Sequence, residues 1–314
     1  MSTPSNAVYA SSPGSSSGSR GITPATNPAI ASMYWSVRRE LWESRSIYIA
    51  PLAVAGLILL GFLIGTLHLR HAERGSSAIN PVHQRVFLEQ PYDFAALLMM
   101  LTTFLVAVFY CLDALHGERR DRSILFWKSL PVSDLTTVLS KAIIPIVVLP
   151  LVTFAITVVT QWIMLLVSSV VLVGYGLSIA ALWNHFSLFP MSVMLLYHLV
   201  AIHGLWYAPI YCWLLLVSGW ARRAAFLWAV LPLLAIAVVE KIAFNTTHFG
   251  TMLAYRLSGG REGAAFTAGG MSMDSLDQIN PGHFLISPGL WIGLAISAVF
   301  LAAAVRLRRY RGPI

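Results

Sequence analysis

One stretch of this sequence decides which kind of fold is possible. Residues 142–221 contain no aspartate, glutamate, lysine or arginine, which makes an uncharged run of 80 residues. A water-soluble fold needs charged side chains on its surface, so no soluble domain accommodates such a run. A bilayer does, because each spanning helix needs about 20 apolar residues and bonds its own backbone groups internally. With 57% of the whole chain hydrophobic and 11% charged, the run predicts an all-α integral membrane protein.

The alternation of apolar and polar segments predicts six transmembrane helices. Residues 1–31 are rich in Ser, Pro, Gly and Ala, which is typical of a disordered tail, and they lack the pattern of a signal peptide. Residues 32–314 then form the membrane domain, with an external, Gly-rich loop over 244–285. The expected spans are 48–68, 93–112, 142–173, 191–217, 224–243 and 286–305.

A short amphipathic helix is predicted ahead of the first span, over residues 33–47. Met33, Val37 and Leu41 share one helical face, and the charged residues face elsewhere. Such a helix lies in the membrane interface, with Trp and Tyr at headgroup depth. The charges and Pro51 favour this interfacial elbow over the alternative, the first turns of a longer span. Its candidate functional residues are Arg39, Glu40, Trp42 and Glu43.

The basic residues orient the chain in the membrane. If both termini are cytosolic, 15 Lys and Arg lie on the cytosolic side and 5 lie outside, as the positive-inside rule requires. We therefore expect a multi-pass protein of the plasma (bacterial inner) membrane with cytosolic termini. The net charge of +8 is explained by these loops, so nucleic acid is not expected as a partner. The two cysteines fall inside apolar segments and are expected to be core residues, not a disulfide.

Sequence motifs for catalysis are missing from this chain. None of its three lysines follows a glycine, so there is no Walker A motif to bind ATP. Residues 257–260 spell LSGG, the start of an ATP-binding-cassette signature, but they fall in the predicted external loop and are interpreted as a coincidence. The histidines lack the H-E-x-x-H spacing of a metal site, and G-x-S-x-G is absent. We expect no catalysis by this chain alone, no metal site and no resident cofactor.

Two ionisable residues end the fifth predicted span. Glu240 and Lys241 are candidates for an outer-gate pair, because charge within a membrane segment is a functional-site hypothesis by default. The alternative is a boundary position, where Lys241 snorkels to the interface and Glu240 meets water or another helix.

The most informative segment is the charged one between the second and third spans, residues 113–141. Glu118 and Arg122 are four residues apart, which favours a helical ion pair. An apolar patch follows over residues 124–130 and predicts a docking surface, with an amphipathic helix lying on the membrane as the alternative. Pro131 breaks the helix, and Ser133 can cap the next one.

The motifs of this segment resemble the coupling-helix region of type 2 ATP-binding-cassette exporter permeases. They are Glu118-Arg119, Arg122-Ser123, Ser129-Leu130-Pro131-Val132-Ser133 and Ser140-Lys141. The chain departs from the family pattern at Arg122, where glycine is common. The residues 39–43 before Pro51 also resemble the elbow helix of that family, and the six-span layout with a long last external loop agrees.

The resemblance implies a permease subunit of an ATP-driven exporter, with a cytosolic coupling helix between spans two and three. A second permease copy, identical or a paralogue, would complete the pathway within membrane lipid, and two ATPase subunits would hold ATP and Mg²⁺. The residues implied in coupling are Glu118, Arg119, Arg122, Phe126, Trp127, Leu130, Pro131, Ser133, Lys141, Arg222 and Arg223. The alternative is a membrane anchor or assembly subunit that transports nothing and holds a soluble partner with the same loop.

Overall fold

Helices are the only regular secondary structure in the part of the chain that the structure describes. The computed structural model describes residues 28–72, 81–123, 125, 132–174, 188–260 and 281–310. The elements, in chain order, are α1 (Pro28–Glu43), α2 (Ser46–Ala72), α3 (Pro81–Ala114), α4 (His116–Arg120), α6 (Asp134–Ile143), η2 (Ile144–Val148), α7 (Leu149–Gly174), α9 (Leu188–His198), η3 (Leu199–Trp206), α10 (Ala208–Trp220), α11 (Ala225–Phe244), α12 (His248–Leu257), α14 (Pro281–Ile286) and α15 (Pro288–Tyr310). The predicted tail lies outside the described residues up to 27, and α1 begins within its last four residues.

Six helical stretches among the described residues are long and apolar enough to cross a membrane. They are Ser46–Thr66, Gln90–Arg120, Asp134–Val170, Phe189–Trp206, Ala225–Phe244 and Pro288–Tyr310. Each overlaps one of the six predicted spans, so the prediction of a multi-pass, all-helical membrane protein is confirmed. The fourth predicted span continues beyond its π-helical end into the shorter apolar helix α10.

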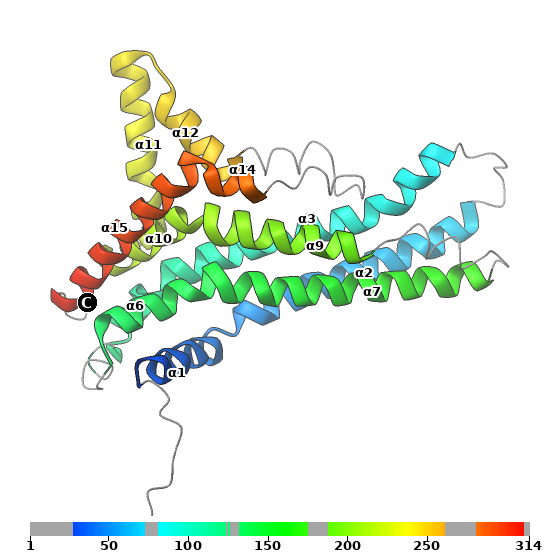
Figure 1. Cartoon of the computed structure of the whole chain (residues 1–314), viewed down its shortest axis with the longest axis horizontal. Coiled ribbons are helices and arrows are strands. Elements are labelled where there is room, and N and C mark those ends of the chain that lie inside the picture. The colour runs from blue at the N-terminus through cyan, green and yellow to red at the C-terminus, as the bar shows by residue number, and fades with distance from the viewer. Residues whose placement is uncertain are drawn as a thin grey trace, which may run out of the picture.

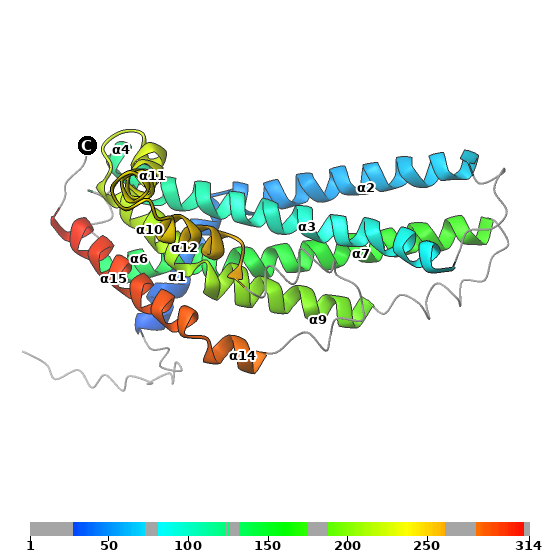
Figure 2. The ribbon, with the colours of Figure 1, turned by 90° about the horizontal axis from the view of Figure 1, so that it is seen from above.

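Three long helices, α2, α3 and α7, form the body of the molecule together with the shorter α9. In Figures 1 and 2, α2, α3, α7 and α9 run side by side along the longest axis, while α15 crosses the end where α4, α6 and α1 gather. Buried methionines, alanines and leucines fill the space between the four, including Met99, Met164 and Leu195. A second core surrounds Tyr211 near the end of the bundle, and it includes the buried free Cys111. Cys212, from the same helix as Tyr211, is also buried and free, as expected.

Helix α11 diverges from this body. It points away from the bundle in Figure 1 and is seen end-on in Figure 2, and it is the least buried of the six apolar stretches. The next helix, α12, returns to the bundle and is anchored there. Trp206 Nε1 donates a hydrogen bond of 3.0 Å to the Arg256 carbonyl, and the Tyr207 hydroxyl donates one of 2.9 Å to the Leu257 carbonyl. The predicted external loop therefore contains an ordered helix.

Two π-helical segments, η2 and η3, pack against each other in the second core. Pro145 lies in η2, where its missing N–H interrupts the α-helical hydrogen-bond ladder and favours the wider π turn. Segment η3 packs against η2 so closely that a Cβ added to Gly204 would lie 2.9 Å from the Ile146 carbonyl oxygen. Only glycine permits this approach of the two backbones without a shift.

Replacing Gly204 by alanine should therefore separate the two π segments. We expect Gly204→Ala to lower the free energy of unfolding by about 1–3 kcal/mol, the usual cost of overpacking a filled core. Gly56→Ala is the matched control, because a Cβ at Gly56 meets nothing within 4 Å. Denaturant titration of both variants in detergent measures the difference. Equal stability of the two variants would contradict the close packing of η2 on η3.

Candidate functional site

Six charged side chains gather where four helices meet at one end of the bundle. We call them the ionic cluster: Arg39, Glu40, Glu118, Asp134, Lys141 and Arg308. They come from α1, α4, α6 and α15, so the cluster joins the beginning, the middle and the end of the described chain. Three are acidic and three are basic, so their charges balance.

Lys141 is the centre of the cluster. Its Nζ lies 2.9 and 3.0 Å from the two carboxylate oxygens of Glu40 and 3.1 Å from Oε1 of Glu118. The side chains of these three residues are only 3–4% exposed. Two further donors reach Glu40: Arg39 at 2.6 Å and the hydroxyl of Tyr110 at 3.0 Å. The Lys141 ammonium donates hydrogen bonds to both carboxylate oxygens of Glu40, and Glu118 is its second counter-charge.

Arg308 attaches the last helix to the same cluster. Its Nη1 donates to Oε2 of Glu118, and its Nε lies 3.2 Å from Oδ1 of Asp134. Arg308 is in the last turn of α15 and is buried. Glu118 therefore pairs with cations of three helices: Arg39 of α1, Lys141 of α6 and Arg308 of α15.

The local sequence explains why α6 contributes a residue from each of its ends to the cluster. The Ser133 side chain caps α6 by accepting a hydrogen bond of 3.0 Å from the Thr136 backbone N–H. This start puts Asp134 in the first turn and Lys141 in the last turn, seven residues apart and on one face. An acid in the first turn and a base in the last turn also suit the helix dipole.

Burying these charges costs free energy, and the attraction between them offsets that cost only when all the partners are present. Burial by itself raises the pKa of the Glu40 carboxyl, but the attraction of Lys141 and hydrogen bonds from Lys141 and Arg39 outweigh it and hold that pKa below its ordinary value of 4.5. Glu40 is therefore ionised at neutral pH. A buried ion pair adds little net stability, yet removal of one partner leaves an uncompensated charge and costs several kcal/mol.

Helix α4 is also tied to the end of α10. The hydroxyl of Ser218 accepts hydrogen bonds from the backbone N–H groups of Leu115 and His116, at 3.1 and 2.8 Å. Arg119 donates to the carbonyls of Gly219 and Ala221, at 2.9 and 3.3 Å. These bonds place the turn with Arg222 and Arg223 directly beside α4.

The structure divides the predicted coupling residues into two groups. Glu118, Arg119 and Lys141 are buried and bind other helices of this chain. The residues on the surface are Arg122, Ser133, Arg222 and Arg223. Phe126, Trp127, Leu130 and Pro131 lie outside the described residues, and the neighbouring Leu125 is 58% exposed.

The expected ion pair between Glu118 and Arg122 is not what the structure shows. Helix α4 ends at Arg120, and Arg122 has a φ of 58°, so its side chain leaves the helical face on which Glu118 lies. Glu118 turns inward and pairs with Lys141 and Arg308 instead. The left-handed backbone at Arg122 is the conformation that glycine adopts without strain.

The other predicted residues have different surroundings. In α1, Arg39 and Glu40 join the ionic cluster, while Trp42 and Glu43 are exposed. Glu240 accepts hydrogen bonds from the Thr246 hydroxyl and from the backbone N–H groups of His248 and Phe249, at 2.8, 2.7 and 2.9 Å. It thus holds the start of α12, and the side chain of its neighbour Lys241 is exposed.

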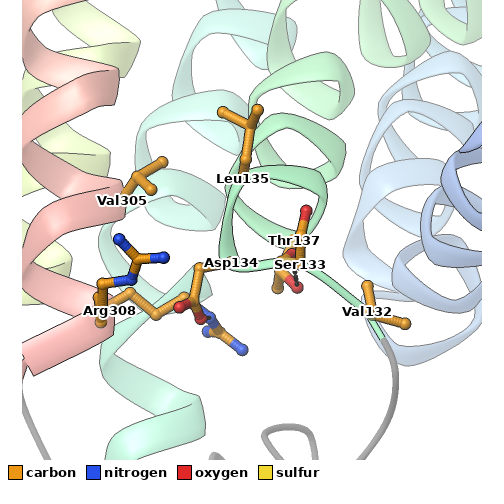
Figure 3. Close-up of a pocket in the computed structure, with 8 residues that line it drawn as sticks. Val132, Ser133, Asp134, Leu135, Thr137, Val305 and Arg308 are labelled. Atoms are coloured by element: carbon orange, nitrogen blue, oxygen red, sulfur yellow. Dashed lines mark hydrogen bonds and ion pairs between the residues drawn. The ribbon is translucent and has the colours of Figure 1, made fainter.

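A pocket of about 490 Å³ opens beside the ionic cluster, between the start of α6 and the end of α15. Figure 3 shows Asp134 and Arg308 facing each other across its wall. It is lined by Val132, Ser133, Asp134, Leu135, Thr137, Val305, Arg308 and Arg309. No group of three metal-ligating side chains occurs among the described residues.

The sequence analysis identified Arg39, Glu40, Glu118 and Lys141 as candidate residues but did not identify Arg308, Asp134 or Tyr110. Comparison of the chain with protein-family models, with curated proteins and with solved structures finds no match.

Loss of the charge on Glu118 should strongly destabilise the fold. Glu118→Gln leaves Lys141 and Arg308 short of a counter-charge, and we expect a loss of about 3–5 kcal/mol of unfolding free energy. Glu43→Gln is the control, since the Glu43 side chain is 60% exposed and an exposed pair contributes at most about 1 kcal/mol. Denaturant titration in detergent measures the unfolding free energy of the two variants. If Glu118→Gln is as stable as Glu43→Gln, the ionic cluster does not hold the helices together.

The same cluster gives the stability a pH dependence. Because the folded-state pKa of Glu40 is lowered, its stabilising contribution is present above the ordinary value of 4.5 and is lost as the pH falls through the lowered pKa. Between about pH 5 and pH 3 the melting temperature of the wild type should fall more steeply than that of Glu40→Gln. If the melting temperatures of the two proteins fall equally steeply over this pH range, Glu40 has an ordinary pKa in the folded state.

Proposed function

We propose that this chain is the transmembrane permease subunit of an ATP-driven exporter of the type 2 ATP-binding-cassette class, and that it forms half of the substrate pathway. The observation that carries the proposal is the ionic cluster. It bonds Glu118 and Lys141, from the motifs that resemble a coupling region, to Glu40, from the helix that resembles the elbow. A segment that transmits force needs such a rigid attachment to the spans.

The connections of the cluster suggest how a push would be transmitted. A partner that displaces residues 124–131 would move α4 and α6, which flank them. Lys141 carries the displacement to α1 through Glu40, and Glu118 carries it to α15 through Arg308. Through Arg119 it reaches the end of α10 and the turn with Arg222 and Arg223. The segment would thus act on four parts of the bundle at once, as a rigid-body lever.

Helix α6 extends this lever deep into the bundle. Residues 134–174 form one continuous helical run, which is roughly 60 Å long at 1.5 Å per residue. The run changes to π-helix at η2, where Gly204 allows the backbone of η3 to touch it. We assign this contact as the pivot of the long helix, because π segments mark places where a helix adjusts its hydrogen bonding.

The energy source belongs to another chain in this proposal. The sequence has no Walker A motif, so ATP and Mg²⁺ would be held by two copies of a separate ATPase subunit. These copies would bind on the side of the ionic cluster, where both ends of the described chain lie (Figure 1). That side would be the cytosol, because the basic residues concentrate there. A second permease copy, identical or a paralogue, would complete the pathway in the plasma membrane.

The apolar surface of the spans favours an apolar or amphipathic substrate. A groove of about 350 Å³ between α2 and α3 is lined almost entirely by apolar groups, among them Leu57, Phe62, Phe94 and Met164. Gly61 and Gly65 of α2 open this groove, since a Cβ at either would meet nothing within 4 Å. Such a surface offers no counter-charge to a strongly polar substrate.

Placing a charge in the docking segment should uncouple the ATPase. Trp127→Asp or Leu130→Asp should weaken binding of the proposed ATPase subunit by at least about 30-fold, the loss typical of an interface hot spot. The measurements are co-purification and ATPase activity in liposomes. Leu285→Asp is the control, because Leu285 is an exposed apolar residue of α14, away from the segment. Unchanged assembly and stimulated activity in the segment variants would refute the coupling role.

The same experiment separates the permease from a membrane anchor. A permease makes the ATPase activity of the complex depend on substrate, so a panel of amphipathic compounds should contain stimulators. An anchor holds the partner through the same segment but leaves its ATPase rate the same with every compound. Retained co-purification with a rate that no compound changes would therefore favour the anchor.

A further inference from the structure

Two adjacent arginines of α1 have opposite surroundings. Arg39 turns into the ionic cluster and pairs with Glu40 and Glu118. Arg38 turns the other way, and its guanidinium lies 5.2 Å from the ring centre of Trp35 and 5.4 Å from that of Trp42. Spacings of three and four residues put Trp35, Arg38 and Trp42 on one face of the helix.

This outer face is exposed although it is largely aromatic. Trp35 and Trp42 are 60% and 72% exposed, and the neighbouring Tyr34 is 59% exposed. The inward face of α1 already packs on the core through Val37 and Leu41. The aromatic face is therefore not needed for folding of the chain itself.

Arg38 has no acidic partner in the part of the chain that is described. The carboxylate of Glu43, one turn further along, pairs with Arg39 at 3.9 Å and not with Arg38. The two indole rings attract the cation through their faces, and the N–H groups at the edge of the guanidinium remain able to donate. A planar fork of donors without a counter-charge matches a phosphate, which it can bind with two parallel hydrogen bonds.

The position of the face identifies the source of the phosphate. Helix α1 ends at Glu43, and α2, the first apolar span, begins at Ser46. The exposed apolar side chains of α2 start immediately with Ile49 and Leu52, which are 52% and 54% exposed. The aromatic face thus continues into a surface that lipid must cover, at the depth where Trp and phospholipid headgroups meet.

We propose that Trp35, Arg38 and Trp42 form a binding site for the phosphate of a phospholipid headgroup, with a preference for anionic lipids. Arg38 binds the phosphate, and the two indoles hold the guanidinium in place and contact the upper acyl chains. The preference for anionic lipid follows because the site carries an uncompensated positive charge. This proposal depends on the six spans and not on the transport function.

The test is the affinity of the purified full-length protein for phosphatidylglycerol and for phosphatidylcholine, measured by native mass spectrometry during titration from mixed micelles. Arg38→Gln should weaken phosphatidylglycerol binding about fivefold, the effect of one basic residue near an anionic surface. Binding of phosphatidylcholine should change less. Arg38→Lys should lie between, because it keeps the charge but loses the planar fork, and Trp35→Leu should weaken both lipids.

Arg306→Gln is the matched control. Arg306 is an exposed arginine of α15 near the same end of the bundle, so Arg306→Gln removes the same charge outside the site and should weaken phosphatidylglycerol binding less than Arg38→Gln does. The proposal is overturned if Arg38→Gln binds phosphatidylglycerol as the wild type does, or if both lipids are weakened equally. It is also overturned if inorganic phosphate displaces the lipid at equal concentration, or if the variant loses a protein partner while its lipid binding stays intact.

Discussion

The arrangement of the helices depends on Lys141, which lies buried between the carboxylates of Glu40 and Glu118. A lone ammonium in such a place is too costly to keep charged, so the position is stable only when both carboxylates are present. Each carboxylate in turn requires its own donors, Arg39 and Tyr110 for Glu40 and Arg308 for Glu118. The interactions are thus interdependent. Loss of one partner weakens the contacts that hold α1, α4, α6 and α15 together.

This interdependence matters more in a membrane protein than in a soluble one. Lipid tails are as apolar as the side chains of the spans, so the hydrophobic effect does not fix where one helix lies against another. Position has to come from close packing and from polar contacts. In the bundle these are the approach of η2 to Gly204 and the hydrogen bond of 2.8 Å between Thr103 and Thr153. At the end of the bundle the ionic cluster has this role, and its charge-assisted hydrogen bonds are stronger than the neutral one between the two threonines.

The spans could be predicted from the sequence because they depend on one property, hydropathy, that each segment carries by itself. The central residues of the candidate site could also be predicted, since Glu118 and Lys141 belong to local motifs. Arg308 was not, because it is one of four arginines near the C-terminus and no local pattern tells which of them turns inward. The expected pair of Glu118 with Arg122 failed for the same reason. The spacing suited a helix, but the helix ends at Arg120 and more distant partners hold Glu118.

Helix α1 links the two proposals, because Arg38 and Arg39 are neighbours on one rigid helix. The orientation of α1 that places Arg39 and Glu40 in the ionic cluster is the same one that turns Arg38 and its tryptophans outward. Linkage between two sites is reciprocal. If the formed cluster increases the affinity of Arg38 for a headgroup, the bound headgroup therefore stabilises the cluster by the same free energy. A lever anchored at the cluster would therefore move against a resistance set by the lipid around α1. In the proposed permease, the lipid around α1 would thus help to set how readily the helices change position.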